Sequence, residues 1–214
     1  MTRLLLMLLV TMATFGCGGP RYVDFFPYHD DGTPKPKIVV LPMSETPDCQ
    51  FPWDVPQELL QGIYGQVMDR GELYVYSQQE VSAKLAQIQP IDFFESDQML
   101  ARQYCGADFI VLTELMEYRY VPSKENCFTN CYLIPYTLHV KVRLRIIDIR
   151  SQCPTVVLQE ILEQSSAICR RFDPRDKAPD FSSEDYQSSS VGRVHEDVIY
   201  RLSNRLEEVI RRVY

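Results

Sequence analysis

The sequence predicts an α/β protein: a mixed β-sheet of about five strands flanked by helices, with a long β-hairpin and a C-terminal helix. Three observations lead to this fold class. Short apolar runs typical of buried strands alternate with amphipathic, helix-like segments over residues 37–115. Residues 136–149 alternate strictly between apolar and polar side chains. Residues 194–214 carry an apolar stripe at helical spacing.

The first half of the chain supplies the alternation of strands and helices. Residues 37–43, KIVVLPM, are expected to form a short strand buried on both faces. A helix follows, with Asp54 as its N-cap and Pro56 in its first turn, and it ends near Arg70 before Gly71. The remaining elements of this half are a strand at 73–76, a helix opened by the capping box of Ser77 and Glu80, a helix at 97–104 and a strand at 109–115.

The second half predicts the hairpin and the last helix. In the strand at 136–149, polar side chains including His139 share one face and apolar side chains the other, which is typical of an antiparallel strand. Pro154 marks the turn into a partner strand at 155–164. Residues 173–193 are rich in Ser, Asp and Pro and predict a loose loop before the helix at 194–214.

Length and charge exclude several classes of protein. A chain of 214 residues is enough for one domain with a tail, and 45% hydrophobic residues is too many for a disordered chain. The formal charge of −7 argues against nucleic acid as a partner, because phosphate neutralisation needs a basic surplus. No apolar run reaches the roughly 18–20 residues of a membrane-spanning helix.

The N-terminus predicts export and a lipid anchor. Arg3 precedes a short apolar stretch, and Gly16 precedes Cys17, which resembles the lipobox of bacterial lipoproteins although Thr14 replaces its usual Leu. That resemblance implies a signal peptide at 1–16, a lipidated Cys17 and tether at 17–36, and a periplasmic domain at 37–214. Gly18 in place of Asp implies outer-membrane sorting. The alternative is an ordinary signal peptide with a chance cysteine.

Cysteine usage fits an exported protein. Besides Cys17 the chain has six cysteines, at positions 49, 105, 127, 131, 153 and 169, and an even number suggests disulfides. Cys127 and Cys131 lie four apart in CFTNC and are the expected pair, whereas Cys105 is expected to be buried and reduced. Three scattered histidines and no second close cysteine pair predict no metal site.

Enzyme motifs are missing from the sequence. It contains no phosphate-binding glycine loop, no H-E-x-x-H and no G-x-S-x-G, so we expect neither a catalytic residue nor a cofactor. His139 is expected to face solvent on its strand, and His195, in the first turn of the last helix, is expected at the surface. The rival reading is an envelope enzyme that uses scattered residues.

Three groups of residues are candidates for binding a partner. Lys141, Arg143 and Arg145 form a cationic stripe that could dock an acidic partner, or a solvated face balanced by Glu160 and similar residues. Trp53, alone in a loop before the first helix, is either a core residue or an interface anchor.

Aromatic residues near the CFTNC turn form the third group. Phe128 and Tyr132 are expected to be partly exposed and to contribute to the binding surface, because aromatic side chains give large contact area at interfaces. The alternative is a loop folded back over the sheet.

Several motifs resemble a known exported domain. The strand at 37–43, the segment with Gly71, Leu73 and Val75, and the Gly-Ala-Asp at 106–108 resemble the domain shared by the N-terminal part of TolB, CsgG and LpoB-type lipoproteins. The resemblance covers residues 37–115 well. It implies an α/β fold and binding to envelope proteins rather than catalysis.

The same family includes secretion pores, which need two long membrane-spanning hairpins. The connection at 120–135 is too short for one and carries Lys124 and Glu125, so the pore is not expected here. The sequence therefore predicts an outer-membrane lipoprotein, facing the periplasm, that binds a protein partner in envelope assembly or in the regulation of cell-wall synthesis. The alternatives are a subunit of an oligomeric secretion assembly, with homo-oligomers, or an envelope enzyme.

Overall fold

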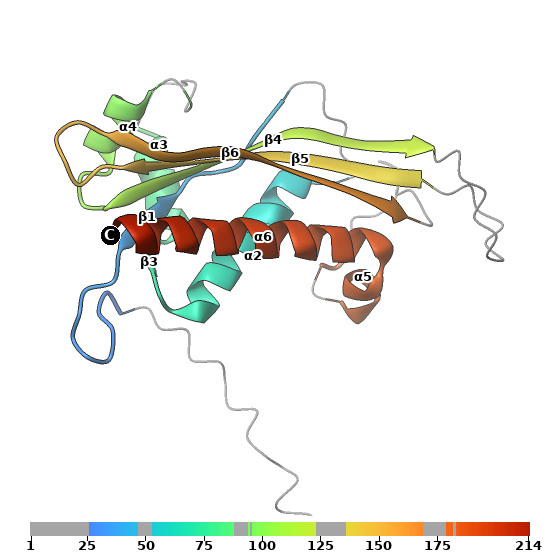
Figure 1. Cartoon of the computed structure of the whole chain (residues 1–214), viewed down its shortest axis with the longest axis horizontal. Helices are drawn as coiled ribbons and strands as arrows, with labels where there is room; N and C mark the ends of the chain where they lie inside the picture. The colour runs from blue at the N-terminus through green and yellow to red at the C-terminus, as the bar shows by residue number, and fades with distance from the viewer. Residues whose placement is uncertain are drawn as a thin grey trace, which may run out of the picture.

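The two long strands predicted for the second half of the chain lie side by side at one side of a mixed sheet (Figure 1). The computed structural model describes residues 26–46, 53–87, 94, 96–122, 136–168, 179–181 and 183–214. Several predictions fall outside these residues: the signal peptide, lipidation of Cys17, the disulfide between Cys127 and Cys131, and the exposure of Phe128 and Tyr132.

The sheet has six strands. Five follow the order β3-β1-β4-β5-β6, and the sixth, β2, pairs with β4. The strands are β1 (Lys37–Val40), β2 (Ser44–Glu45), β3 (Tyr74–Val75), β4 (Phe109–Pro122), β5 (Tyr136–Asp148) and β6 (Thr155–Ile168). Strand β1 pairs in parallel with β3 and with β4, and β2 also pairs in parallel with β4. Strand β5 pairs antiparallel with both β4 and β6. The predicted mixed α/β sheet is therefore confirmed.

Strands β4 and β6 are longer than the sequence predicted. The prediction ended them at residues 115 and 164, but they continue to Pro122 and Ile168. The extra residues of both strands pair with the first residues of β5, and β4 contains a register shift between Leu115 and Glu117. That irregularity interrupts the alternation by which the strand would be recognised.

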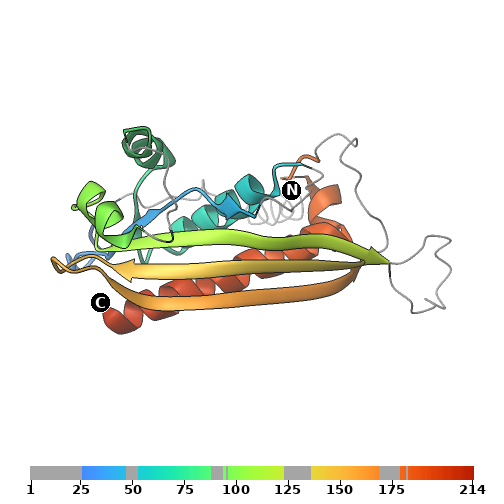
Figure 2. The same cartoon turned by 90° about the horizontal axis from the view of Figure 1, so that it is seen from above.

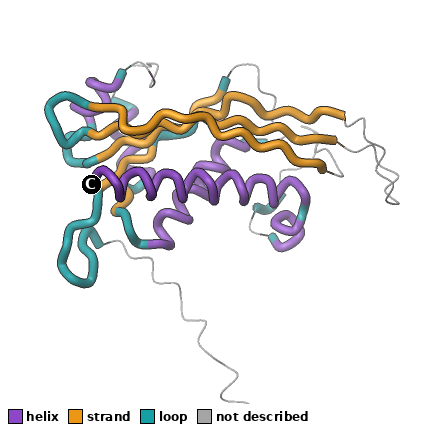
Figure 3. Tube along the Cα trace, in the orientation of Figure 1, coloured by secondary structure: helices purple, strands orange, loops and turns teal. Residues whose placement is uncertain are grey.

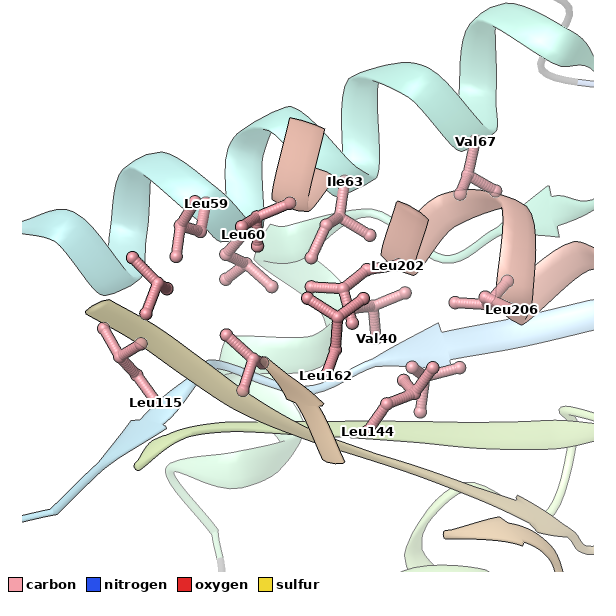
Figure 4. Close-up of a cluster of buried hydrophobic side chains, with 14 of the residues drawn as sticks. Val40, Leu59, Leu60, Ile63, Val67, Leu115, Leu144, Leu162, Leu202 and Leu206 are labelled. Atoms are coloured by element: carbon pink, nitrogen blue, oxygen red, sulfur yellow. The ribbon is translucent and has the colours of Figure 1, made fainter. Parts of the chain in front are cut away.

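Helices α2 (Val55–Arg70) and α6 (Ser190–Val213) cover one face of the sheet. Figure 3 shows α2, α6 and the short helix α5 (Glu184–Ser188) together on one side of the strands. Figure 4 shows leucine and valine side chains of both helices meeting those of the strands in a buried apolar core. The ends of α2 follow the prediction: the Asp54 side chain accepts a hydrogen bond from the Gln57 N–H, and Gly71 has a φ of +69°.

Among the described residues, helices cover the opposite face at one end only. There α3 (Gln78–Leu85) and α4 (Asp97–Gln103) pack on a second, smaller core that includes Val39, Ile110 and Ile147. Figure 2 shows these two helices at the end of the sheet where β1 and β3 lie. The capping box of Ser77 and Glu80 is present at the start of α3 as predicted.

The segment predicted as a loose loop contains helical structure, so that prediction was wrong for its second part. Helix α5 (Glu184–Ser188) precedes α6, and α6 begins at Ser190 rather than near Val194. The serines taken for loop residues are N-caps: the Ser183 and Ser189 hydroxyls accept hydrogen bonds from the N–H groups of Tyr186 and Gly192.

Hydrogen bonds and cation–π contacts of Arg150 connect the end of α6 to the sheet. The guanidinium lies over the rings of Phe109 at 5.0 Å and Tyr214 at 5.5 Å. Its Nη2 donates to the Val213 carbonyl at 2.9 Å and to Asp148 Oδ2 at 2.6 Å. The hydrogen bond that Arg150 donates to Asp148 holds the pKa of this carboxyl below its usual value.

We expect Arg150→Ala to lower the free energy of unfolding by about 1–2 kcal/mol at pH 7. The pKa of Asp148 is lower in the folded state than its unfolded value of 3.8. The ion pair therefore stabilises the fold fully at pH values above 3.8, and this stabilisation is lost as the pH falls through the folded pKa. The loss caused by Arg150→Ala should therefore shrink between pH 7 and pH 3 in urea denaturation curves. Arg119→Ala, which removes an exposed pair with Glu117, is the control and should change little. An equal loss at both pH values would contradict the coupling.

Candidate functional site

A hydrogen-bonded cluster of aromatic and ionisable side chains is buried where α2, α5, α6 and β4 meet. Glu58 comes from α2, Tyr186 from α5, His195 from α6 and Tyr118 from β4, and Trp53 lies just before α2. His195 is 1% exposed and Glu58 is 7% exposed. We call these five residues the Glu58 cluster.

Both carboxylate oxygens of Glu58 accept hydrogen bonds. Oε1 lies 2.6 Å from the Tyr186 hydroxyl and 2.9 Å from His195 Nδ1, and Oε2 accepts the Trp53 indole N–H at 2.8 Å. A buried carboxylate is tolerated only when such donors replace its water shell. The cluster thus joins three helical elements and a loop through one side chain.

The second ring nitrogen of His195 is also engaged. Nε2 lies 3.1 Å from the Tyr118 hydroxyl, which in turn lies 3.2 Å from the Tyr120 hydroxyl. Burial raises the pKa of Tyr118 and of Tyr186, so both phenols keep their protons and can donate them in hydrogen bonds. Donation from His195 Nδ1 to Glu58 leaves Nε2 to accept from Tyr118.

The expectation that His195 lies at the surface was wrong. Because α6 begins four residues earlier than predicted, His195 lies in its second turn, where it shares the inward stripe with Val191, Val198 and Leu202. An ionisable residue within an apolar stripe is the signal in the sequence that could have identified it. Glu58 has the same signature beside Val55, Leu59 and Ile63 of α2.

A groove of about 660 Å³ lies between α2 and α6, and α5 contributes to its lining. Glu58 and His195 form part of its buried wall, while Gln61, Gln187 and Glu196 are exposed along it. Phe181 and Tyr186 contribute aromatic rings whose centroids are 5.4 Å apart. The groove therefore combines aromatic, amide and carboxylate groups. We call it the helical groove.

Trp53 is half-buried at this site. Its ring centroid lies 6.0 Å from those of Phe181 and Tyr186 and 6.3 Å from that of His195. Trp53 packs against the core, as one of its two interpretations held, and its ring neighbours Phe181 and Tyr186 line the helical groove. Its role in binding stays a prediction.

The cationic stripe lies on the opposite face of the sheet from the Glu58 cluster. Lys141, Arg143 and Arg145 form ion pairs with Glu163 at 2.7 Å, Glu114 at 2.9 Å and Asp97 at 2.6 Å. Arg143 also lies over the Phe94 ring. Docking of an acidic partner to this stripe stays a prediction, although each of the three cations already has a carboxylate beside it.

Glu160 does not balance that stripe, so this expectation was wrong. It lies on the other face of β6, where both of its oxygens accept from Arg205 of α6 at 3.0 Å. Successive side chains of a strand point to opposite faces, which places Glu160 with the helices and Glu163 with the cationic stripe.

The remaining chemical candidates are surface groups. Cys105 and Cys153 carry free thiols and are exposed, so the expectation of a buried Cys105 was wrong: it lies in the turn that follows α4. His139 Nδ1 lies 2.8 Å from the Ser165 hydroxyl across the β5–β6 pair. Among the described residues, no group of three His, Cys, Asp or Glu side chains could hold a metal ion.

The sequence matches the model of a protein family over residues 24–213, nearly its whole length. The chain belongs to this family. It is described as a family of unknown function, DUF7499. No protein in the curated collections matches the sequence. Membership in DUF7499 thus places nearly the whole chain in one family without assigning it an activity.

Solved structures share the fold of this DUF7499 protein. The hypothetical protein CT253 from Chlamydia trachomatis has a TM-score of 0.59 and 20% identity, with 82% of this chain and 98% of that chain covered. Lipoprotein GNA1162 from Neisseria meningitidis has a TM-score of 0.42 and 16% identity, with 79% and 99% covered. The C-terminal domain of LpoB from Salmonella enterica has a TM-score of 0.35 and 12% identity, with 62% and 82% covered.

These likenesses concern the fold. Of these three structures, CT253 alone has a TM-score above 0.5, and at 20% identity it shows a shared fold and no function. Within the described part of the DUF7499 chain, no helix is both long and apolar enough to cross a membrane.

Proposed function

We propose that this protein is a lipid-anchored protein of the bacterial outer membrane whose α/β domain binds a protein partner through the helical groove. The observation that carries the proposal is an open groove of about 660 Å³ whose wall is fixed by the Glu58 cluster. Rigidly held aromatic and polar groups at a concave surface favour recognition. The partner class implied by the sequence resemblance is a protein of envelope assembly or of cell-wall synthesis.

Binding without catalysis fits the geometry of His195. A general base needs a ring nitrogen within hydrogen-bond reach of a substrate proton. Here Nδ1 faces Glu58 and Tyr186, and Nε2 faces the buried Tyr118 hydroxyl. Both nitrogens of His195 are therefore committed to the fold, which supports a binding role over the rival enzyme.

Crosslinking in cells tests the groove. A photoreactive amino acid at Gln61 or Gln187, both exposed along the groove, should crosslink one defined envelope protein. The same group at Glu45, exposed on β2, is the control and should not capture that protein. Equal capture from all three positions, or from Glu45 alone, would contradict binding at the groove.

The lipid anchor is tested at Cys17. We expect Cys17→Ser to move the protein from the membrane fraction to the soluble fraction almost completely, because acyl chains contribute about 0.8 kcal/mol per buried methylene and the anchor is lost with the thiol. Cys105→Ser, which removes an exposed thiol of the domain, should leave the protein at the membrane. Membrane association that survives Cys17→Ser would refute the lipoprotein assignment.

The open edge of β6 favours a second candidate, a homo-oligomer. This 14-residue strand ends the sheet, and Ile161 on it is 49% exposed. Long edge strands can pair with a second copy of the chain. Mass measurement in detergent should then give a multiple of the mass of one lipidated chain, and a monomer would exclude this candidate.

A further inference from the structure

Carboxylates outnumber basic side chains in the two segments that contain the residues lining the helical groove. Residues 53–67 and 179–199, which supply the helices that line it, contain seven carboxylates and one arginine. The carboxylates are Asp54, Glu58, Asp180, Glu184, Asp185, Glu196 and Asp197, and the arginine is Arg193. Of these carboxylates, Glu58 and Glu196 line the groove itself. Such a local field attracts cations to one face.

The Glu58 carboxylate adds negative charge at the wall of the groove. The Trp53 N–H and the Tyr186 hydroxyl satisfy its oxygens but bring no positive charge, and His195 brings none in its neutral form. Charges in a partly desolvated setting act more strongly than in water. A cation entering the groove would meet this field as well as that of the exposed Glu196.

The other groups of the groove suit a basic side chain. The rings of Phe181 and Tyr186 offer faces for a guanidinium or ammonium group and for its aliphatic stem. Gln61 has a carbonyl oxygen that can accept from the N–H groups of arginine or lysine. At about 660 Å³ the groove exceeds the volume of one side chain, which favours a peptide segment over a small amine.

We propose that the helical groove docks a lysine- or arginine-bearing segment of the partner protein. This inference rests on the proposed partner-binding function and specifies the chemistry of that partner. The basic segment lies between α2 and α6 with a cationic side chain near Glu196 and the Phe181 ring. Charge complementarity sets the association rate and the choice of partner more than the total affinity.

Binding of a defined peptide tests this. The full-length chain in non-ionic detergent is titrated into a fluorescein-labelled decapeptide of alternating arginine and alanine, with a glutamate–alanine decapeptide as the negative probe. The double variant Glu184→Gln with Glu196→Gln should bind the basic peptide about tenfold more weakly. Both glutamates are exposed and lie outside the Glu58 cluster, so the fold should persist.

A matched control separates local from overall charge. Glu72→Gln with Glu163→Gln removes the same formal charge from exposed sites outside the groove and should change the affinity less than twofold. In spectra of the wild-type chain, the amide signals of Gly62 and Gly192, which line the groove, should shift on binding. Equal weakening in both double variants, or no shift of these two amides, would overturn the proposal.

Two further outcomes also decide against it. If crosslinking from Gln61 captures a protein but the basic peptide does not bind, the groove binds a partner of other chemistry: the inference fails and the proposed function stands. If the peptide binds only after Arg170, Arg171, Arg175 and Lys177 are replaced with alanine, the groove belongs to this basic stretch of the same chain. That result would overturn docking of a partner segment.

Discussion

Glu58→Leu is expected to lower the free energy of unfolding by about 3–5 kcal/mol, the range for breaking a buried, hydrogen-bonded charge. The substitution removes the acceptor of three hydrogen bonds, which come from the Trp53 indole N–H, the Tyr186 hydroxyl and His195 Nδ1. Glu58→Gln should cost less, because an amide oxygen can still accept from Tyr186 while its NH₂ group faces another donor. Urea denaturation at pH 7 measures both losses.

The single tryptophan of the chain gives this prediction a local readout. Because Trp53 donates to Glu58 and lies beside Tyr186, its emission spectrum should change in folded Glu58→Leu protein even before denaturant is added. Glu72→Leu, at an exposed site beyond the cluster, should alter neither the emission nor the stability by more than about 0.5 kcal/mol. A Glu58→Leu protein as stable as the wild type would show that the cluster does not hold α5 and α6 to α2.

The secondary structure was predictable wherever one local rule decided it. The alternation in β5 placed Leu138, Val140 and Val142 on the buried face, and Asp54 and Gly71 bounded α2 as their cap chemistry requires. The sequence failed where a rule depends on partners far along the chain. The second half of β4 follows a register shift and is recognisable only by its pairing with β5.

The Glu58 cluster could not be assembled from the sequence, because its members lie far apart along the chain: 137 positions separate Glu58 from His195. Trp53 was singled out, but its neighbour Tyr186 lay in a segment read as a loop. Serine-rich composition suggested that loop, whereas Ser183 and Ser189 act as caps. Misreading two caps also moved the start of α6, and that shift placed His195 at the surface in the prediction.

Gly192→Ala is expected to lower the free energy of unfolding by about 1–3 kcal/mol, the range for overpacking that forces the backbone to move. A Cβ at this position would lie 2.1 Å from the Tyr186 carbonyl oxygen and 3.2 Å from Gln187 Cα. Neither atom is a flexible side-chain end, so α5 has to shift away from the first turn of α6. Tyr186 would then leave its positions beside Glu58 and His195. The variant therefore separates the cluster without changing any of its members.

Gly65→Ala is the matched control for this prediction. Gly65 also lies in a helix, but a Cβ there meets nothing within 4 Å, so alanine should stabilise α2 by about 0.5–1 kcal/mol. If Gly192→Ala lowers the free energy of unfolding and Gly65→Ala raises it, the close approach of α5 to α6, and not helix propensity, decides the effect at Gly192. Hydrogen exchange should locate the damage: in Gly192→Ala the amides of residues 184–188 should exchange faster, while those of β5 stay protected. If Gly192→Ala were stabilising and the amides of α5 kept their protection, the packing of α5 against α6 would not support the wall of the helical groove.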